Sequence, residues 1–349
     1  MTSTAATAGL LKPKVRVGEA VERVVGLLIV VGVVAWIVYN FVAEPKQCIS
    51  VLLTGLNNGA LYALVALGYT LVYGIIELIN FAHGDLFMLG TLFSANFLVN
   101  RLGFTSPSLN ATLGLVLTFV LTMAFCALIN MSAEFFAYRR LRRAPKLAPL
   151  ITAVGLSFVF QNIGLKWNGS TPKQWPSVIS TGGFTVGGVL VRWSLIVTLC
   201  VTALLLFILT FIVQRTRQGK AMRATAQDQD GARLMGINVD RTISFTFALG
   251  GAAAGAAAVL SVQTLGTTRY DQGFQFGLIA FTAAVLGGIG NLVGAVVGGM
   301  LIGIVQAAND GFPHGFGQEW SQTVVFSILI LLLVFKPEGL FGQRTTEKV

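Results

Sequence analysis

Long runs of apolar residues recur along the chain, and short polar segments separate them. The runs are continuous, and most approach the about 20 residues with which an α-helix crosses the hydrocarbon core of a bilayer. Strands of a membrane β-barrel are about half as long and alternate in polarity, so the pattern excludes that architecture. The runs occupy residues 24–43, 48–76, 84–99, 111–130, 147–165, 194–213, 242–264, 274–309 and 323–335.

The run at 274–309 carries a charge-free break at Gly287-Gly288-Ile289-Gly290-Asn291. Because Gly and Asn favour turns, we expect the chain to reverse there, which makes two helices of one run. The run at 24–43 is longer than the apolar part of a usual secretory signal, and no small-residue cleavage site follows it, so we expect an uncleaved first helix. The pattern as a whole predicts the all-α class: a polytopic transmembrane helix bundle of about 8–10 spans.

Composition agrees with this interpretation and charge adds an orientation. The 349 residues are 54% hydrophobic and 11% charged, whereas a soluble domain carries about 25% charge, so a soluble enzyme and a disordered protein are excluded. With the N-terminus inside, 18 of the 24 Lys and Arg residues fall in the inner segments 1–23, 132–146, 214–241 and 336–349. This bias predicts that both termini are cytoplasmic, which requires an even number of crossings and favours ten. The net charge of +10 therefore reports topology and not nucleic-acid binding.

Glycines recur four residues apart inside several runs. Such spacing lets helix backbones approach closely in lipid, either within the bundle or at a seam with another subunit. The rows are Gly55 and Gly59, Gly251 and Gly255, Gly290, Gly294 and Gly298, and Gly299 and Gly303. The largest polar segments, 166–193 and 214–241, are too short to fold alone.

Polar residues inside the apolar runs are candidates for function, because they are costly in lipid. Asn57 and Asn58 lie within a run and either line an aqueous path or hydrogen-bond across helices. Asn80, His83 and Asp85 lie between two runs, where their neighbours favour a helix break or a re-entrant corner. There Asp85 is placed to cap the next helix, and His83 has either a pathway role or a structural one. We take all five as candidate pathway residues.

Catalytic and metal chemistry find no support in the residues. There is no Gly-x-Ser-x-Gly elbow, and Gly219-Lys220 is followed by Ala221, so no phosphate-binding loop is present. One His and one Asp are too few ligands for a metal site. We therefore predict no catalytic residue, no metal and no cofactor bound by this chain.

The inner segment 214–241 has a pattern of its own. Helix-forming residues fill 220–227, Asp228 to Gly231 favours a turn or a second helix start, and Gly236 follows. Composition alone leaves open whether this is a docking element or a solvated loop.

Four motifs together resemble the permease family of ATP-binding-cassette (ABC) importers for branched-chain amino acids, of the LivH type, and the match extends along nearly the whole chain. Two departures are Asp85, where Glu is commoner in the family, and Gly231, where Ala is commoner. The motifs are Gly68-Tyr-Thr-Leu-Val-Tyr73-Gly74 through Asn80-Phe-Ala-His83-Gly84, Ala224-Thr-Ala-Gln-Asp228 through Gly236-Ile-Asn-Val-Asp-Arg241, Ala280-Phe-Thr-Ala-Ala-Val-Leu-Gly-Gly-Ile-Gly290, and Pro337-Glu-Gly-Leu-Phe-Gly342.

The resemblance implies a permease subunit that translocates leucine, isoleucine and valine across the cytoplasmic membrane of a bacterium or archaeon. Its partners would be a related second permease, two ABC ATPase subunits that bind ATP and Mg²⁺, an external solute-binding protein and membrane lipid, but no nucleic acid. The domains would be a cytoplasmic tail at 1–23, a permease domain at 24–335 and a second tail at 336–349. The loop at 214–241 would couple to the ATPase through Gly219, Arg223, Asp228, Arg233 and Gly236.

Alternative functions remain open at this point. A urea or short-amide permease belongs to the same family. An ion-coupled secondary transporter would need intramembrane acids, for which only Glu77 and Asp85 are available. A passive channel is disfavoured because the sequence holds no ring of charges and no repeated filter.

Overall fold

The computed structural model describes residues 32, 35–78, 80–103, 109–142, 144–145, 147–175, 182–336 and 338–342. The tail predicted at 1–23, half of the run at 24–43 and residues 343–349 lie outside this part of the chain. The chain divides into two units, Met1–Pro45 and Lys46–Val349. In the first unit, residues 35–43 are helical.

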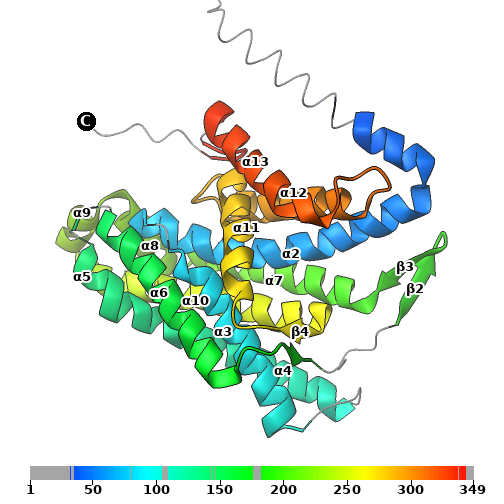
Figure 1. Ribbon diagram of the computed structural model, residues 1–349. Helices are drawn as coiled ribbons and strands as arrows, with labels where there is room; N and C mark the ends of the chain where they lie inside the picture. Colours follow the sequence, from blue (N-terminus) through cyan, green and yellow to red (C-terminus); the bar gives the residue numbers. More distant parts are fainter. Residues whose placement is uncertain are drawn as a thin grey trace, which may run out of the picture. The chain divides into compact units, whose positions relative to one another are not determined.

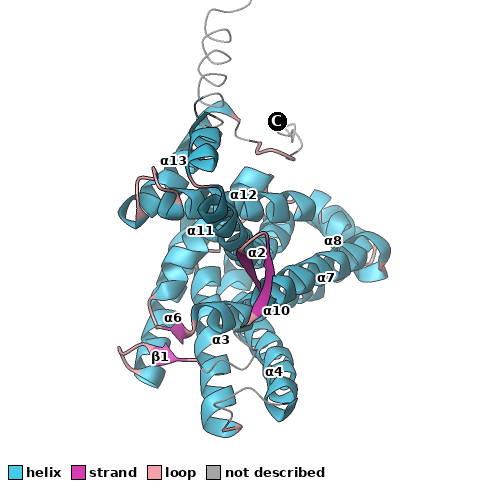
Figure 2. Cartoon of the chain, turned by 90° about the vertical axis from the view of Figure 1, so that its right-hand side faces the viewer, coloured by secondary structure: helices cyan, strands magenta, loops and turns pink. Residues whose placement is uncertain are grey.

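The second unit is built almost entirely from helices (Figures 1 and 2). Two π-helical segments, η1 (Phe97–Arg101) and η2 (Glu134–Tyr138), extend α3 and α4, and a short 3-10 helix, η3 (Gln318–Trp320), precedes α13. The helices are α2 (Pro45–Ile76), α3 (Ala82–Asn96), α4 (Leu109–Ala133), α5 (Arg139–Leu141), α6 (Leu147–Asn168), α7 (Trp193–Arg215), α8 (Arg217–Gln227), α9 (Gln229–Leu234), α10 (Val239–Leu265), α11 (Gln272–Gly287), α12 (Leu292–Gly311) and α13 (Ser321–Phe335).

Seven helices in the described part of the chain are long and apolar enough to cross a membrane. They confirm the all-α polytopic class, and α3 and α11 are shorter helices that fall between them in sequence. The break predicted in 274–309 is also confirmed, since Gly288 and Gly290 adopt φ of 95° and 96° between α11 and α12. The seven spans are Pro45–Ile76, Asn110–Leu141, Leu147–Asn168, Trp193–Arg215, Val239–Leu265, Leu292–Gly311 and Gln318–Phe335.

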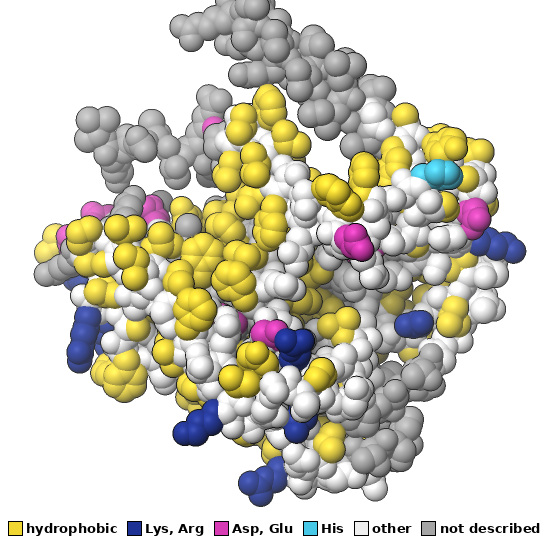
Figure 3. Space-filling model, viewed as in Figure 1, with side chains coloured by type: hydrophobic (Ala, Val, Ile, Leu, Met, Phe, Trp, Pro, Cys, Tyr) yellow, Lys and Arg dark blue, Asp and Glu magenta, His cyan; other side chains and the backbone are white. Residues whose placement is uncertain are grey.

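Burial separates central from peripheral helices. Within the apolar 18-residue stretch of each helix, 83% of α2 and 72% of α10 is buried inside the protein. The corresponding shares are 22% for α7 and 17% for the span that contains α13. The peripheral helices instead expose large apolar side chains such as Phe207 and Val334. On the face that Figure 3 shows, hydrophobic side chains outnumber the charged ones. Such surfaces are stable against lipid tails, which are as apolar as the side chains.

Four short strands were not expected from the sequence. Strands β2 (Gly183–Val186) and β3 (Val189–Arg192) form an antiparallel hairpin, and β1 (Lys173–Gln174) pairs with β4 (Thr267–Thr268). Gly187 and Gly188 join the hairpin with positive φ at both positions, as a two-residue turn requires. This pair of glycines between β-branched residues was the available signal.

The glycine rows pack helices of this chain against each other. A Cβ at Gly55 or Gly59 would lie 2.8 or 2.7 Å from a Cα atom of α12, and one at Gly255 would lie 2.8 Å from Met123 Cα in α4. Gly294 and Gly298 contact the C-terminal turns of α11 in the same way. The structure thus uses these glycines, apart from Gly290, for close helix packing within the chain.

Replacing Gly59 by valine is expected to destabilise the permease, because the added methyl groups meet the backbone of α12. Overpacking of this kind costs about 1–3 kcal/mol, which lowers the melting temperature by roughly 2–10 °C. Thermal unfolding in detergent, followed by size-exclusion chromatography, measures the change. Gly155→Val is the control, since a Cβ added at Gly155 of α6 would have no neighbour within 4 Å; equal melting of the two variants would contradict the packing role.

Candidate functional site

The polar corner predicted between two spans is present where α2 ends and α3 begins. Helix α2 stops at Ile76, and Glu77 adopts φ of 52°, which is unique among the described non-glycine residues. A non-glycine residue rarely takes this conformation, and where it does the surroundings hold it there. The chain re-enters a helix at Ala82, and His83 N donates to Asn80 O at 3.1 Å.

His83 is 1% exposed and lies against α2. Its ring meets Tyr69 edge-on, with centroids 4.9 Å apart, and it sits where a side chain at Gly68 would otherwise be. Neither ring nitrogen has a hydrogen bond of normal geometry to another described residue. The ring is thus held by its packing against Tyr69 and α2.

Asp85 is fully buried in the first turn of α3. One carboxylate oxygen accepts from Ser157 Oγ of α6, and the other has no partner among the described side chains. The expectation that Asp85 caps α3 is wrong: the N-cap position is Phe81, and the α2–α3 corner begins the helix without a side-chain cap. The carboxylate still lies near the positive end of the helix dipole.

The remaining pathway candidates divide into two groups. Asn80 belongs to the corner, where its Oδ1 accepts from Tyr138 Oη at 2.7 Å. Asn57 is buried with an unpartnered Oδ1, and Asn58 is half-buried. Both lie on α2 about 18 Å from Tyr69 at 1.5 Å per residue, so the structure does not bring them to the corner.

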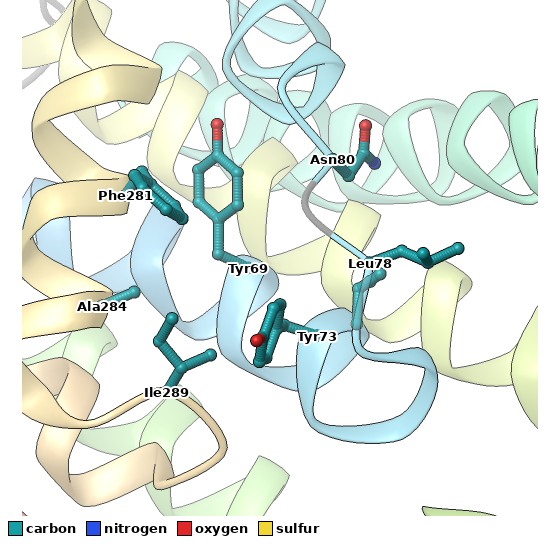
Figure 4. A pocket seen from close by; sticks show the side chains of 8 residues that line it. Tyr69, Tyr73, Leu78, Asn80, Phe281, Ala284 and Ile289 are labelled. Atoms are coloured by element: carbon teal, nitrogen blue, oxygen red, sulfur yellow. The ribbon is translucent and has the colours of Figure 1, made fainter. Parts of the chain in front are cut away.

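A small pocket lies beside the corner (Figure 4). Tyr69, Tyr73 and Asn80 line it on one side, and Phe281 and Ala284 of α11 line it on the other. Tyr73 and Ile289 also line a larger cavity of about 630 Å³, which the ends of α2 and α7, helix α8 and the turn between α11 and α12 enclose. The small pocket beside the corner and the open cavity at the end of the bundle thus have two wall residues in common.

Helices α8 and α9 form the element predicted at 214–241. Thr216 accepts from Gly219 N to cap α8, and Asp228 accepts from Asp230 N to cap α9. Gly219 packs on the carbonyl groups that end α7, where no Cβ fits, and Gly236 takes φ of 80° after α9. The pattern of a helix, a break and a second helix that ends before a glycine is confirmed.

Two arginines of this element make contacts within the chain. Arg223 donates to Val213 O at the end of α7 and lines the 630 Å³ cavity, and Arg233 pairs with Asp230 of its own helix at 2.8 Å. Leu234 and Met235 were not predicted from the sequence, and they are 88% and 84% exposed at the end of α9. An apolar pair inside an otherwise polar segment was the signal for them.

Helices α5, α8 and α9 gather at one end of the bundle, and the β2–β3 hairpin lies at the opposite end (Figure 1). Apolar spans surround a buried polar corner, and an open cavity lies at one end of the bundle. This construction defines a polytopic α-helical membrane protein.

Comparison with known proteins makes the class specific. The family model for the permease component of branched-chain amino acid transport systems matches residues 51–333. The chain is 40% identical over 305 residues to the high-affinity branched-chain amino acid transport system permease protein BraD of Pseudomonas aeruginosa, an alignment that covers 85% of this chain and 97% of BraD. It is 38% identical over 302 residues to LivH of Escherichia coli, which bears the same description, with 84% and 96% covered.

A solved structure of PsaBC from Streptococcus pneumoniae in complex with Fab matches with a TM-score of 0.38 at 15% identity, over 86% of this chain and 95% of that one. The chain belongs to the family of permease components of branched-chain amino acid transport systems. The family resemblance found in the motifs is thereby confirmed, and the named relatives are transport permease proteins.

Proposed function

We propose that this chain is the membrane-spanning permease subunit of an ABC importer and translocates leucine, isoleucine and valine by alternating access. The relatives named for branched-chain amino acid transport support the substrate class. The observation that carries the mechanism is the wall shared between the polar corner and the end cavity, which α8 borders. In this mechanism, a solute that passes the corner would enter the end cavity beside α8.

The corner offers groups suited to a zwitterionic amino acid. The free carboxylate oxygen of Asp85 would accept from the substrate ammonium group, and the Tyr69 hydroxyl and His83 ring would face its carboxylate. These groups are closed off from solvent in this conformation, so transport requires the helices around them to separate. Asn57 and Asn58 would line the same path nearer the other end of α2.

The energy would come from partner chains. Two ATPase subunits with bound ATP and Mg²⁺ would dock on α8 and α9, a related second permease would complete the pore, and an external solute-binding protein would deliver substrate. The excess of Lys and Arg supports a position of α8 and α9 on the cytoplasmic side of the inner membrane, together with both termini. This chain itself would bind no cofactor. Coupling exists only if nucleotide favours one permease conformer over the other.

Uptake by the reconstituted complex tests the proposal. Proteoliposomes that contain the permease pair, both ATPases and the binding protein should accumulate leucine when ATP is supplied, and urea should not compete. Dissipating proton and sodium gradients should leave the rate unchanged. Uptake that follows an ion gradient and ignores ATP would identify a secondary transporter instead.

Arg223→Glu is expected to leave membrane insertion intact and to uncouple ATP hydrolysis from uptake. The substitution removes the hydrogen bond that holds α8 to the end of α7, and it places an acid in the end cavity. We expect leucine transported per ATP to fall about tenfold, the effect of a charged hydrogen bond worth about 1.5 kcal/mol. Lys220→Glu, on the same helix, is the control; unchanged stoichiometry in Arg223→Glu would contradict this role.

A further inference from the structure

A buried carboxylate lies directly after the C-terminal end of α4, outside the site described above. Glu134 is fully buried, and its oxygens accept from Arg139 Nη2 at 3.0 Å, from Arg142 and from Ser244 Oγ of α10 at 2.5 Å. Arg139 also donates to Ser244 at 2.7 Å. A charge in this position is tolerated only because it is paired and hydrogen-bonded on both oxygens. The cluster therefore fixes α10 firmly to the end of α4.

The backbone is adapted to this cluster. Glu134 begins the π-helical turn η2, which ends at Tyr138. Residues five apart lie about 140° apart around an α-helix, so Glu134 and Arg139 would diverge in one. The wider π turn aligns residues i and i+5 and brings them into contact, and π turns are frequent at functional positions.

On one side, the cluster contacts the start of α10, which follows the docking element formed by α8 and α9. Arg142 forms a second ion pair with Asp240 at 2.6 Å, in the first turn of α10. Asp240 follows Gly236, which ends the α8–α9 element, by four residues. A displacement of α9 therefore acts on the η2 turn through charged contacts to the start of α10.

On the other side, the same turn reaches the polar corner. Tyr138 is 1% exposed, and its hydroxyl donates to Asn80 Oδ1 at 2.7 Å. Asn80 in turn accepts from the backbone of His83 at 3.1 Å. One turn of helix thus contacts both the start of α10, next to the docking element, and the residues around His83.

We propose that Glu134, Arg142 and Tyr138 are positioning residues that transmit movement of the docking element to the α2–α3 corner. This inference rests on the proposed function and assigns a part of its coupling to residues that touch neither nucleotide nor substrate. When α9 moves, the pairs with Asp240 and Ser244 carry the η2 turn along, and Tyr138 shifts Asn80 and opens the corner.

The test measures coupling in proteoliposomes that contain the full complex. Tyr138→Phe removes one hydrogen bond and should lower leucine transported per ATP about fivefold while basal ATP hydrolysis is unchanged. Asn80→Ala removes the acceptor of the same hydrogen bond and should lower this ratio to a similar extent. The double variant should be no worse than either single one, because both remove the same contact. Tyr62→Phe is the matched control, since the buried Tyr62 hydroxyl donates to Gln306 at 2.7 Å away from the relay; it should leave the ratio unchanged.

Asp240→Asn tests the ion pair between Arg142 and the start of α10. The Asp240 side chain is half exposed, so the loss of its charge should not prevent folding. It should lower the stimulation of ATP hydrolysis by substrate-loaded binding protein, an effect that a purely structural pair would not produce. The relay is overturned if the variants transport as much leucine per ATP as Tyr62→Phe does. It is also overturned if the losses multiply in the Tyr138→Phe/Asn80→Ala variant. Either result leaves the proposed function intact. A wild-type complex that does not couple ATP to uptake overturns both.

Discussion

Replacing Leu234 and Met235 together by aspartate is expected to abolish ATP-driven uptake while the permease remains folded. Both side chains are almost fully exposed, so their loss removes little packing from this chain, and surface substitutions usually change stability by less than about 0.5 kcal/mol. In the complex they would be the apolar anchors of α9 against an ATPase subunit. Two anchors worth about 2 kcal/mol each correspond to a roughly thousandfold loss of affinity.

Co-purification of the ATPase subunits with the tagged permease measures this loss directly, and leucine uptake measures its consequence. Phe316→Asp is the control, because Phe316 is also highly exposed but lies after α12, at the end of the bundle opposite α9. It should retain the ATPase subunits. If the Leu234→Asp/Met235→Asp variant retains them equally well, the ATPase docks on another surface.

The sequence predicted the helices closely because each is defined by a local property. The apolar run at 48–76 predicted α2 closely: the helix begins three residues earlier, at Pro45, and ends at the same residue, Ile76. The turn residues at 287–291 located the break between α11 and α12, where Gly288 and Gly290 supply positive φ. Asp228 predicted the second helix start in the inner segment, because its side chain caps the helix that follows.

What the sequence could not supply depends on contacts between distant segments. The spacing of Gly55 and Gly59 predicts a close helix approach but not that α12 is the partner. Glu134 looked like one acid among many basic residues of an inner segment, and only the fold brings Ser244 and Asp240 to it and to Arg142. For the same reason the hydrogen bond from Arg223 to the end of α7 could not be predicted, and its coupling to a partner stays a prediction.

Asp85→Asn is expected to lower leucine uptake about a hundredfold with no loss of assembly. The amide keeps the volume of the buried side chain and its contact with Ser157, but it removes the charge that would hold the substrate ammonium group. A charged hydrogen bond of about 3 kcal/mol corresponds to a factor of about a hundred. Asp85→Glu keeps the charge and should retain most uptake.

Initial rates of uptake by the assembled complex measure the effect. Asp310→Asn is the control, since Asp310 accepts from Asn309 and Ser321 at the far end of α12 and lies off the path. It should transport at the wild-type rate. Full uptake by both Asp85→Asn and His83→Ala would leave the corner with a structural role only.

A further pair of variants distinguishes a space-filling role of His83 from a direct role toward the substrate. In Gly68→Ala the new methyl group occupies the space of the imidazole, so the ring must move and uptake should be lost. Adding His83→Ala removes the clash and should restore thermal stability. If both uptake and stability return in this double variant, the ring only fills space beside Tyr69. If stability returns without uptake, the imidazole acts on the substrate, because the new methyl group already fills the space of the ring.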